Sequence, residues 1–331
     1  MHKYPKVNYI GNKEKLVEWI ISEMPIKTGK VLDIFSGGCS VSYAMKDAGY
    51  EVIANDILYA DYIIAKALLS NDTKAISEEV FKTKINIRRV ETIRNKISFL
   101  ANKLYYSEEV DELAKLLAIS EKLEDNQKYL FLALVRRAMI RKLPYSRMNI
   151  PWNQIQQLRD EEYSYKKYKR KRAYHNQTFE NHIMENLEEY NNALFKGKKC
   201  EIYNFDAVKI AKKISEVDVV YMDPPYPSTM NNYDAFYGMF DEMFSKKNKH
   251  LDFTNKNTFL NNLEKLIKIL EGKTKYIVLS QNTRVQPKPE EIAKMLLQYG
   301  EVEIKEKNHN YQVTGKVNKN SSKELLFILK F

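Results

Sequence analysis

Residues 30–38 read KVLDIFSGG, and this stretch indicates the architecture of the chain. Residues 30–35 form a short apolar run of strand-forming residues, and the glycines that follow lead into a helical segment at 41–48. A second strand-like run at 50–54 ends at Asn55-Asp56, and residues 57–69 again look helical. Alternating strands and helices predict an α/β fold with a parallel sheet, because parallel neighbours need a crossover connection.

The same pattern of strands and helices returns near the end of the chain, whereas the middle of the chain differs. We expect strands at 200–205, 217–222, 276–280, 301–307 and 324–329, and helices at 257–270 and 289–299. From about residue 76 to 194, polar segments carry apolar residues at helical spacing, and strand signals almost disappear. We therefore predict an α/β domain of residues 1–78 and 200–331, interrupted by a helical insertion of residues 79–199.

The net charge of +11 predicts an anionic partner, and most of it lies in the insertion. Residues 79–199 contain 25 Lys and Arg against 16 Asp and Glu, a net charge of +9. Aromatic residues are interleaved with the basic ones, which favours nucleic acid; the alternative for each basic residue is a solvated helix face. The residues predicted to contact DNA are Arg136, Arg137, Arg141, Lys142, Arg147, Asn149, Lys169, Arg170 and Arg172.

The tetrapeptide Asp223-Pro224-Pro225-Tyr226 follows the apolar run 219–222 and so lies at the end of an expected strand. The Asp223 carboxylate and the Pro224 carbonyl can each accept one hydrogen of an exocyclic amine, and Tyr226 offers a face on which a base can stack. The prolines fix the local backbone. This pattern favours methylation of a planar amine over the alternative, a strand that simply runs into a proline-rich turn.

The glycine turn and Asp56 together indicate a ligand that contains a nucleoside. Gly37 and Gly38 follow the first strand, where an open α/β sheet presents backbone amides and a helix N-terminus. Asp56 ends the second strand, where a carboxylate accepts hydrogen bonds from ribose hydroxyls. The alternative is a dinucleotide-binding turn, but the sequence has no G-x-G-x-x-G motif, and it has no P-loop for triphosphate hydrolysis.

Composition argues against several classes of protein. Cys39 and Cys200 are the only cysteines, and the five histidines show no ligand spacing, so we predict no metal site. Neither cysteine follows a proline, which disfavours covalent methylation of cytosine carbon 5. No apolar run is long enough to span a membrane and the N-terminus is polar, so we expect a cytoplasmic protein without a membrane partner.

The chain resembles the Dam-like adenine-N6 DNA methyltransferases, the alpha group of amino-methyltransferases that use S-adenosylmethionine. Residues 9–13 (YIGNK) resemble the family's Y-x-G-G-K segment, residues 35–39 (FSGGC) its F-x-G-G-G turn, and residues 204–206 (NFD) its D-F segment. Residues 223–226 match its D-P-P-Y motif at every position, and residues 147–151, 280–282 and 323–328 are similar to further segments. Asn12 and Cys39 depart from the glycines of the family pattern.

The resemblance implies a class I S-adenosylmethionine-dependent methyltransferase fold, with a Rossmann-like, mixed seven-stranded sheet and an inserted, mainly helical DNA-recognition domain. It implies a catalytic role for Asp223, Pro224, Pro225 and Tyr226. The cofactor-binding residues implied by the motifs are Tyr9, Gly11, Lys13, Asp33, Phe35, Ser36, Gly37, Gly38, Asp56, Phe205 and Asp206.

The implied activity is site-specific transfer of a methyl group to the N6 amine of adenine in double-stranded DNA, directly and on a flipped base. The implied setting is a restriction–modification system with a cognate restriction endonuclease, and the enzyme is expected to be a cytoplasmic monomer of a prokaryote. Three alternatives stay open: a cytosine-N4 methyltransferase, a methyltransferase of ribosomal RNA or of a protein glutamine, and a non-catalytic nucleic-acid-binding protein with this fold.

The segment after the tetrapeptide, residues 231–248, is rich in aromatic side chains. Two interpretations are open for it: a lid that closes over the flipped base, or the buried face of a helix. The residues concerned are Tyr233, Phe236, Tyr237, Phe240 and Phe244.

Overall fold

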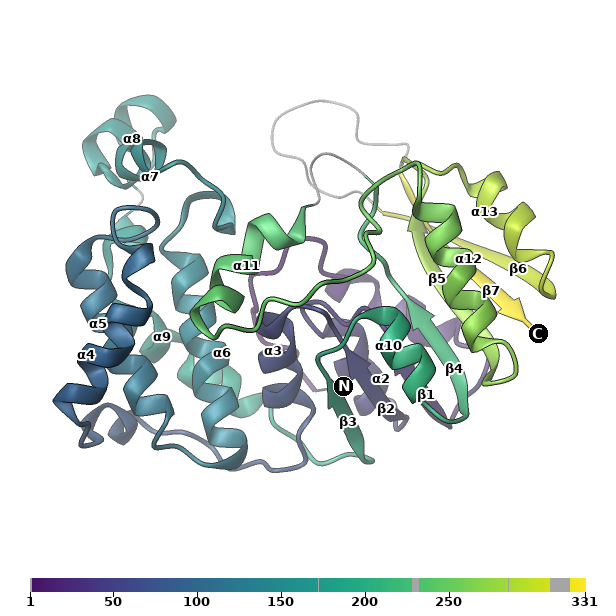
Figure 1. Ribbon diagram of the computed structural model, residues 1–331, viewed down its shortest axis with the longest axis horizontal. Helices are drawn as coiled ribbons and strands as arrows, with labels where there is room; N and C mark the ends of the chain where they lie inside the picture. Colours follow the sequence, from purple (N-terminus) through teal and green to yellow (C-terminus); the bar gives the residue numbers. More distant parts are fainter. Residues whose placement is uncertain (1, 172, 228–231, 285, 310–321) are drawn as a thin grey trace.

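The computed structural model describes residues 2–171, 173–227, 232–284, 286–309 and 322–331, and its centre is a seven-stranded sheet (Figure 1). The strand order is β3-β2-β1-β4-β5-β7-β6, in which β7 lies antiparallel between β5 and β6 and the other neighbours are parallel. The mixed seven-stranded α/β sheet is therefore confirmed. The strands are β1 (Lys30–Asp33), β2 (Glu51–Asn55), β3 (Cys200–Tyr203), β4 (Val217–Met222), β5 (Thr274–Asn282), β6 (Glu301–Asn308) and β7 (Lys323–Lys330).

Helices make up most of the remaining described structure. The α-helices are α1 (Val17–Ser22), α2 (Ser40–Asp47), α3 (Tyr59–Leu69), α4 (Ile87–Lys96), α5 (Ser107–Ser120), α6 (Asp125–Arg141), α7 (Trp152–Arg159), α8 (Glu161–Tyr168), α9 (Phe179–Asn192), α10 (Ala207–Lys213), α11 (Tyr233–Met243), α12 (Phe259–Leu270) and α13 (Pro289–Leu296). Short 3₁₀ helices are η1 (Glu14–Leu16), η2 (Glu78–Lys82), η3 (Ser98–Leu100), η4 (Pro144–Ser146) and η5 (Ala173–Asn176).

Helices cover both faces of the sheet, so its central strands are buried on two sides. Val31 and Val219 pack on one face, and Leu32 and Val220, the next residues along β1 and β4, pack on the other. α1, α2 and α3 cover the first face, and α10, α12 and α13 cover the second, which lies toward the viewer in Figure 1. Strands buried on both faces have continuous apolar sequences, which is why their positions could be predicted.

The expected elements of the α/β part agree with the observed ones to within a few residues. The strand expected at 217–222 has these bounds in the structure, and the helix expected at 57–69 begins two residues later, at Tyr59. α1 and α10 were not predicted. They contain six and seven residues, which is too short for helical periodicity to stand out from the surrounding sequence.

The middle of the chain is helical, as expected. Between β2 and β3 the described residues contain no strand, apart from an isolated bridge between Ala101 and Tyr105. α6 packs against both α3 and α9, and its buried side chains belong to the same core as the first face of the sheet. The division of the chain at residues 79 and 199 stays a prediction, because α3, α6 and α9 share that core.

α11 is fixed to the rest of the fold by a buried carboxylate. Asp241 accepts hydrogen bonds from the backbone N–H groups of Tyr59 (2.7 Å) and Ala60 (2.9 Å) at the start of α3. These amides have no partner within their own helix, so the contact satisfies them. Burial raises the pKa of Asp241 to about 7. The contact holds α11 beside the carboxyl ends of the parallel strands.

Candidate active site

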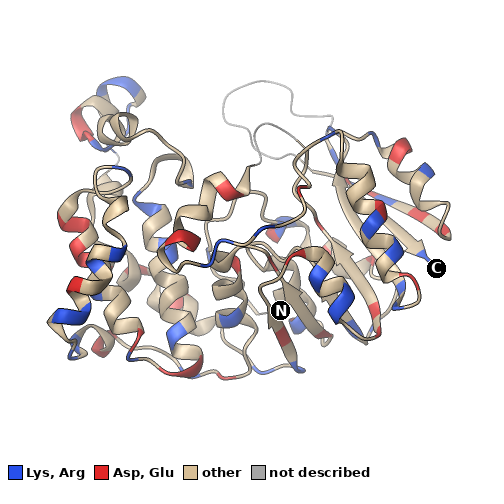
Figure 2. Ribbon diagram, in the orientation of Figure 1, with Lys and Arg blue, Asp and Glu red and all other residues tan. Residues whose placement is uncertain are grey.

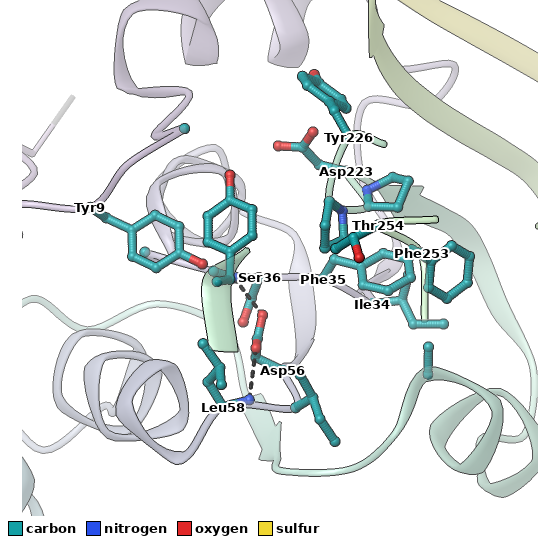
Figure 3. A pocket seen from close by; sticks show the side chains of 18 of the residues that line it. Tyr9, Ile34, Phe35, Ser36, Asp56, Leu58, Asp223, Tyr226, Phe253 and Thr254 are labelled. Atoms are coloured by element: carbon teal, nitrogen blue, oxygen red, sulfur yellow. Dashed lines mark hydrogen bonds between the residues drawn. The ribbon is translucent and has the colours of Figure 1, made fainter. Parts of the chain in front are cut away.

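A cavity of about 1860 Å³ lies at the carboxyl ends of β1, β2, β4 and β5. Its lining includes every residue that the sequence predicted for cofactor binding and all four residues of the Asp223–Tyr226 motif. In Figure 3, Asp223 and Tyr226 lie together at one end, and Asp56 and Leu58 lie at the other. Pockets for one small molecule usually measure about 300 to 1,000 Å³, so this cavity has room for two ligand groups side by side.

The turn after β1 is shaped by residues with left-handed backbone. Gly37 has a φ of 47°, and Cys39, the N-cap residue of α2, has a φ of 70°. The family pattern has glycine at both positions because glycine adopts this conformation without steric cost. The Tyr9 side chain packs on the turn: a Cβ atom built at Gly38 would lie 2.9 Å from the Cβ of Tyr9. A larger residue at Gly38 would therefore displace Tyr9 from the cavity wall.

Asp33 carries an unsatisfied acceptor at the cavity edge. Its Oδ2 accepts a hydrogen bond from the Ser42 hydroxyl (2.6 Å). Its Oδ1 is buried and has no hydrogen-bond partner among the described residues, and the same is true of the Ser36 hydroxyl. Burial raises the pKa of Asp33 to about 7. A buried carboxylate oxygen without a donor suits a ligand that brings its own, such as an ammonium group.

Asp56 joins the ends of two neighbouring strands. Its carboxylate accepts hydrogen bonds from the N–H of Gly37 (2.8 Å) in the turn after β1 and of Leu58 (3.0 Å) after β2 (Figure 3). Burial raises the pKa of Asp56 to about 6. A carboxylate has about four lone-pair sites, so Asp56 can also accept from a ribose hydroxyl.

Phe205 and Asp206 also line the cavity, but the Asp206 carboxylate has a structural task. It accepts hydrogen bonds from the N–H groups of Val208 (2.9 Å) at the start of α10 and of Leu251 (2.9 Å). This second contact holds residues 247–254 against the cavity, where the Phe253 ring lies edge-on to Phe35 at 5.1 Å. This wall was not predicted, because residues 247–254 show no motif or periodicity.

Lys13 lies at the catalytic end of the cavity. Its ammonium is 3.0 Å from the Asp223 carboxylate and donates a hydrogen bond to the Tyr226 hydroxyl (2.7 Å), and its side chain is 3% exposed. These contacts connect the 9–13 segment with the catalytic motif, whereas the expected partner of Lys13 was the cofactor. Burial raises the pKa of Asp223 to about 6, and the Lys13 ammonium opposes this shift.

Glu324, on β7, is a site residue that sequence reasoning missed. It is fully buried and accepts hydrogen bonds from the hydroxyls of Tyr226 (2.9 Å) and Ser280 (2.6 Å). The same carboxylate lies 3.3 Å from the Lys13 ammonium. The available signal was an acidic residue at the start of an otherwise apolar strand, and acidic residues are rarely buried unless they are paired.

The aromatic segment after the tetrapeptide forms α11, and its residues divide between the two interpretations. Tyr237 and Phe240 belong to the buried core, and the Tyr237 hydroxyl accepts a hydrogen bond from the N–H of Ile10 (2.9 Å). Tyr233 and Phe236 line the cavity, and the Tyr233 ring stacks on Tyr9 at 5.7 Å. α11 is therefore a core helix with one edge exposed to the site; Asn231 lies outside the described residues.

Three residues predicted to contact DNA are buried instead, and that prediction was wrong for them. Arg136 is 1% exposed, donates a hydrogen bond to the carbonyl of Val7 (2.8 Å) and lies over the Tyr237 ring. Arg137 donates to the carbonyl of Lys6. Lys142 is 1% exposed and pairs at 2.7 Å with Glu109, which also binds Arg159. These cations fasten α6 to the N-terminal segment and to α5.

The remaining predicted DNA contacts lie at or near the surface. Asn149, Lys169 and Arg170 are exposed, Arg141 and Arg147 are partly buried, and Arg172 lies outside the described residues. A smaller pocket of about 320 Å³ is lined by Arg141, Arg170 and other residues, while Arg147 lines the large cavity. Figure 2 shows Lys and Arg at the end of α8 and along the segment after α11.

Two further predictions concern metals and membranes. Among the described residues, no group of three or more His, Cys, Asp or Glu side chains is arranged to hold a metal ion. No helix in the described part of the chain is both long and apolar enough to cross a membrane.

The chain is similar to known DNA methyltransferases over most of its length. The family model described as D12 class N6 adenine-specific DNA methyltransferase matches residues 9–295. The chain is 44% identical over 338 residues to Type II methyltransferase M2.HphI of Haemophilus parahaemolyticus, which covers 99% of this chain and 98% of the relative. It is 22% identical over 347 residues to Type II methyltransferase M.CviAII of Paramecium bursaria Chlorella virus 1, with 92% of each chain covered.

Proposed function

The chain belongs to the D12 class N6 adenine-specific DNA methyltransferases, and we propose that it transfers a methyl group from S-adenosylmethionine directly to an adenine flipped out of double-stranded DNA. The observation that carries this proposal is the arrangement of two acidic sites in one cavity. Asp56 lies at one end, Asp223 and Tyr226 lie at the other (Figure 3), and Asp33 also lines the cavity.

The glycine-turn end fits S-adenosylmethionine. The unsatisfied Oδ1 of Asp33 would accept from the ammonium of its methionine part, and the free lone pairs of Asp56 would accept from the ribose hydroxyls. Phe205 and the 247–254 wall would flank the adenine ring. When bound, this cofactor supplies a methyl group on a positively charged sulfur.

The catalytic end fits an exocyclic amine. One oxygen of Asp223 and the carbonyl of Pro224 would each accept a hydrogen of the N6 amine, which localises its lone pair toward the methyl group. The hydroxyl of Tyr226 is occupied by Lys13 and Glu324, so this ring is held in place to stack on the base. After transfer the cationic nitrogen gives up one proton, which the Asp223 carboxylate would receive, because a methylated aminium is far more acidic than a carboxylic acid.

Exposed and partly buried cations of the helical insertion would bind the DNA backbone. Arg147 lines the cavity and lies over the Phe236 ring, with 5.6 Å between the guanidinium carbon and the ring centre. Arg141 and Arg170 line the smaller pocket, and Lys169 and Asn149 are exposed nearby in sequence. Phosphate contacts of this kind supply most of the affinity for DNA, and flipping a base costs a few kcal/mol that they and stacking must offset.

The names of the two relatives support a type II restriction–modification setting, in which a cognate restriction endonuclease cuts the same sequence when it is unmethylated. We propose this setting for the chain, in the cytoplasm of a prokaryotic cell. The residues that we assign to the cofactor and to the base all line the cavity of one chain, and we propose that the enzyme acts as a monomer.

Methyl transfer to three nucleic acids tests the proposal. Purified protein is incubated with tritium-labelled S-adenosylmethionine and with duplex DNA, ribosomal RNA or single-stranded RNA. The expected result is label in duplex DNA alone. Label confined to RNA, or cofactor binding without transfer to any of the three, would contradict the proposed function.

A further inference from the structure

Glu324 is a buried acidic residue next to the catalytic motif. It lies on β7 opposite Asn282 of β5, and it is fully buried. A carboxylate is rarely buried in this way unless hydrogen bonds and an opposite charge compensate for the loss of water. Glu324 has both, since Ser280 and Tyr226 donate hydrogen bonds to it and Lys13 is its ion-pair partner.

Lys13 connects this carboxylate with the catalytic one. Its ammonium lies 3.0 Å from Asp223 and 3.3 Å from Glu324, so two carboxylates share a single cation. The Tyr226 hydroxyl accepts a hydrogen bond from Lys13 and donates one to Glu324, which closes the network. With both carboxylates ionised, the cluster of Asp223, Glu324 and Lys13 carries one net negative charge.

We propose that Glu324 is a positioning residue for methyl transfer: it holds Lys13 and the Tyr226 hydroxyl toward β7, which leaves an Asp223 oxygen free for the adenine amine. This inference rests on the proposed role of Asp223. Without Glu324, Asp223 would be the carboxylate left beside the Lys13 ammonium among the ion pairs of the described residues, and a carboxylate engaged fully by an ammonium is a poorer acceptor for a neutral amine.

The charge of the cluster also suits the reaction. In the transfer, the bond between sulfur and the methyl carbon breaks, its electron pair stays on sulfur, and the lone pair of N6 forms the new bond to carbon. The positive charge thus moves from sulfur to N6, and one N6 proton then leaves to Asp223. A fixed net negative charge beside N6 stabilises that developing positive charge, and in a site without water the effect is larger than in solution.

Other ionisable groups face the two carboxylates. Tyr221 and Asp33 interact electrostatically with Asp223, and His309 interacts with Glu324 and Lys13. The Glu324 charge raises the pKa of Asp223, and the Lys13 charge lowers it. Removal of either charged partner should therefore shift the titration of Asp223, in opposite directions.

This pair of opposite shifts is the test. The protein is labelled with ¹³C at aspartate carboxyl carbons, and the Asp223 resonance is identified as the one absent from Asp223→Asn. We expect its titration midpoint to move to lower pH in Glu324→Gln, which keeps the shape and hydrogen-bonding oxygen of the side chain but removes its charge. We expect it to move to higher pH in Lys13→Met. Glu306→Gln on β6, an exposed carboxylate paired with Lys323, is the matched control and should leave the midpoint unchanged.

Kinetics provide the second readout. In Glu324→Gln we expect kcat to fall by roughly tenfold to a hundredfold, which is the range seen when a group that orients a catalytic residue is removed. The KM values for cofactor and DNA should stay within about twofold of those of the wild-type protein. An unchanged Asp223 midpoint or an unchanged kcat in Glu324→Gln would overturn the inference. If Glu324→Gln does not fold, Glu324→Asp, which keeps the charge but shortens the side chain, is measured instead; we expect kcat to fall in it, and an unchanged kcat would overturn the inference. The proposed function has its own test: methyl transfer by Asp223→Asn would contradict the catalytic role of Asp223.

Discussion

The ammonium of Lys13 lies 2.7 Å from the hydroxyl of Tyr226, across 213 residues of chain. The N-terminal segment thus completes the catalytic end of the cavity, although it begins far from the Asp223–Tyr226 motif in sequence. The contact exists because Lys13, just before η1, lies beside the carboxyl ends of β4 and β5, where Asp223 follows β4 and Asn282 ends β5.

Lys13→Met should therefore damage the chemistry more than cofactor binding. We expect kcat to fall by about tenfold or more, because the variant loses the cation that orients Asp223 and Tyr226. The Kd for S-adenosylmethionine should change by less than about twofold. Isothermal titration calorimetry and single-turnover methylation measure the two quantities. A large loss of cofactor affinity with unchanged kcat would contradict this prediction and would show that Lys13 acts in cofactor binding.

Cofactor affinity should depend on pH through Asp33. Burial raises the pKa of Asp33 to about 7, and the ionised form is the one that binds an ammonium. The affinity for S-adenosylmethionine should therefore increase as the pH rises from about 5.5 to about 8. At pH values below the pKa of Asp33 in the cofactor-free protein, binding should also release the proton of this carboxyl group. Calorimetry in buffers of different ionisation enthalpy measures that proton. Asp33→Asn should bind more weakly and show no pH dependence in this window, whereas Ser42→Ala should keep it.

The stability of the unliganded protein should fall as the pH rises through neutrality. Burial raises the pKa values of Asp33 and Asp241 to about 7 and that of Asp56 to about 6. A carboxyl whose pKa is higher in the folded state binds its proton more tightly there. Its contribution to the free energy of unfolding is therefore complete at pH values below its pKa in the unfolded state, and it is lost as the pH rises through its pKa in the folded state. The loss is up to about 1.4 kcal/mol for each tenfold difference in proton affinity between the two states.

Urea denaturation at four values between about pH 5 and about pH 8 measures this effect. We expect the free energy of unfolding to decrease across the series and the decrease to be smaller in Asp241→Asn, whose side chain lies outside the cavity lining and can still accept one backbone hydrogen bond. Stability that increases over this range in the wild-type protein would contradict the account of these buried carboxyls.

DNA affinity should depend on the two arginines of the smaller pocket. The Arg141→Gln, Arg170→Gln double variant should bind duplex DNA more weakly. The slope of log Kd against log salt should fall by about one for each phosphate that the variant no longer neutralises. Fluorescence anisotropy from about 50 to about 300 mM salt measures this slope. Lys82→Ala, which removes an exposed cation of the same insertion, is the control. An unchanged slope in the double variant would show that this pocket does not bind backbone phosphate.

The sheet and its covering helices could be predicted from the sequence because their signals are local. β4 is an apolar run followed by a distinctive tetrapeptide, and the glycines after β1 mark the turn that we assign to the cofactor. Asp33, Asp56 and Asp223, which the same local patterns singled out, line one cavity, because the carboxyl ends of neighbouring parallel strands lie at one edge of a sheet.

The errors came from interactions between distant segments. Arg136 looks like a surface cation in sequence, but α6 is buried on several sides by α3, α9 and the N-terminal segment, whose Val7 carbonyl binds its guanidinium. Glu324 was missed for the same reason: its partners Lys13, Tyr226 and Ser280 belong to three other parts of the chain. Local periodicity carries no information about such partners.

Nucleoside analysis of methylated duplex DNA tests the central claim most directly. A duplex is incubated with S-adenosylmethionine and either the wild-type protein or Asp223→Asn, then digested to nucleosides and measured by mass spectrometry. We predict N6-methyldeoxyadenosine with the wild-type protein, and at least about a thousandfold less with Asp223→Asn, because the variant loses the acceptor that positions the amine. N4-methylcytosine as the product, or equal methylation of adenine by Asp223→Asn, would contradict the account.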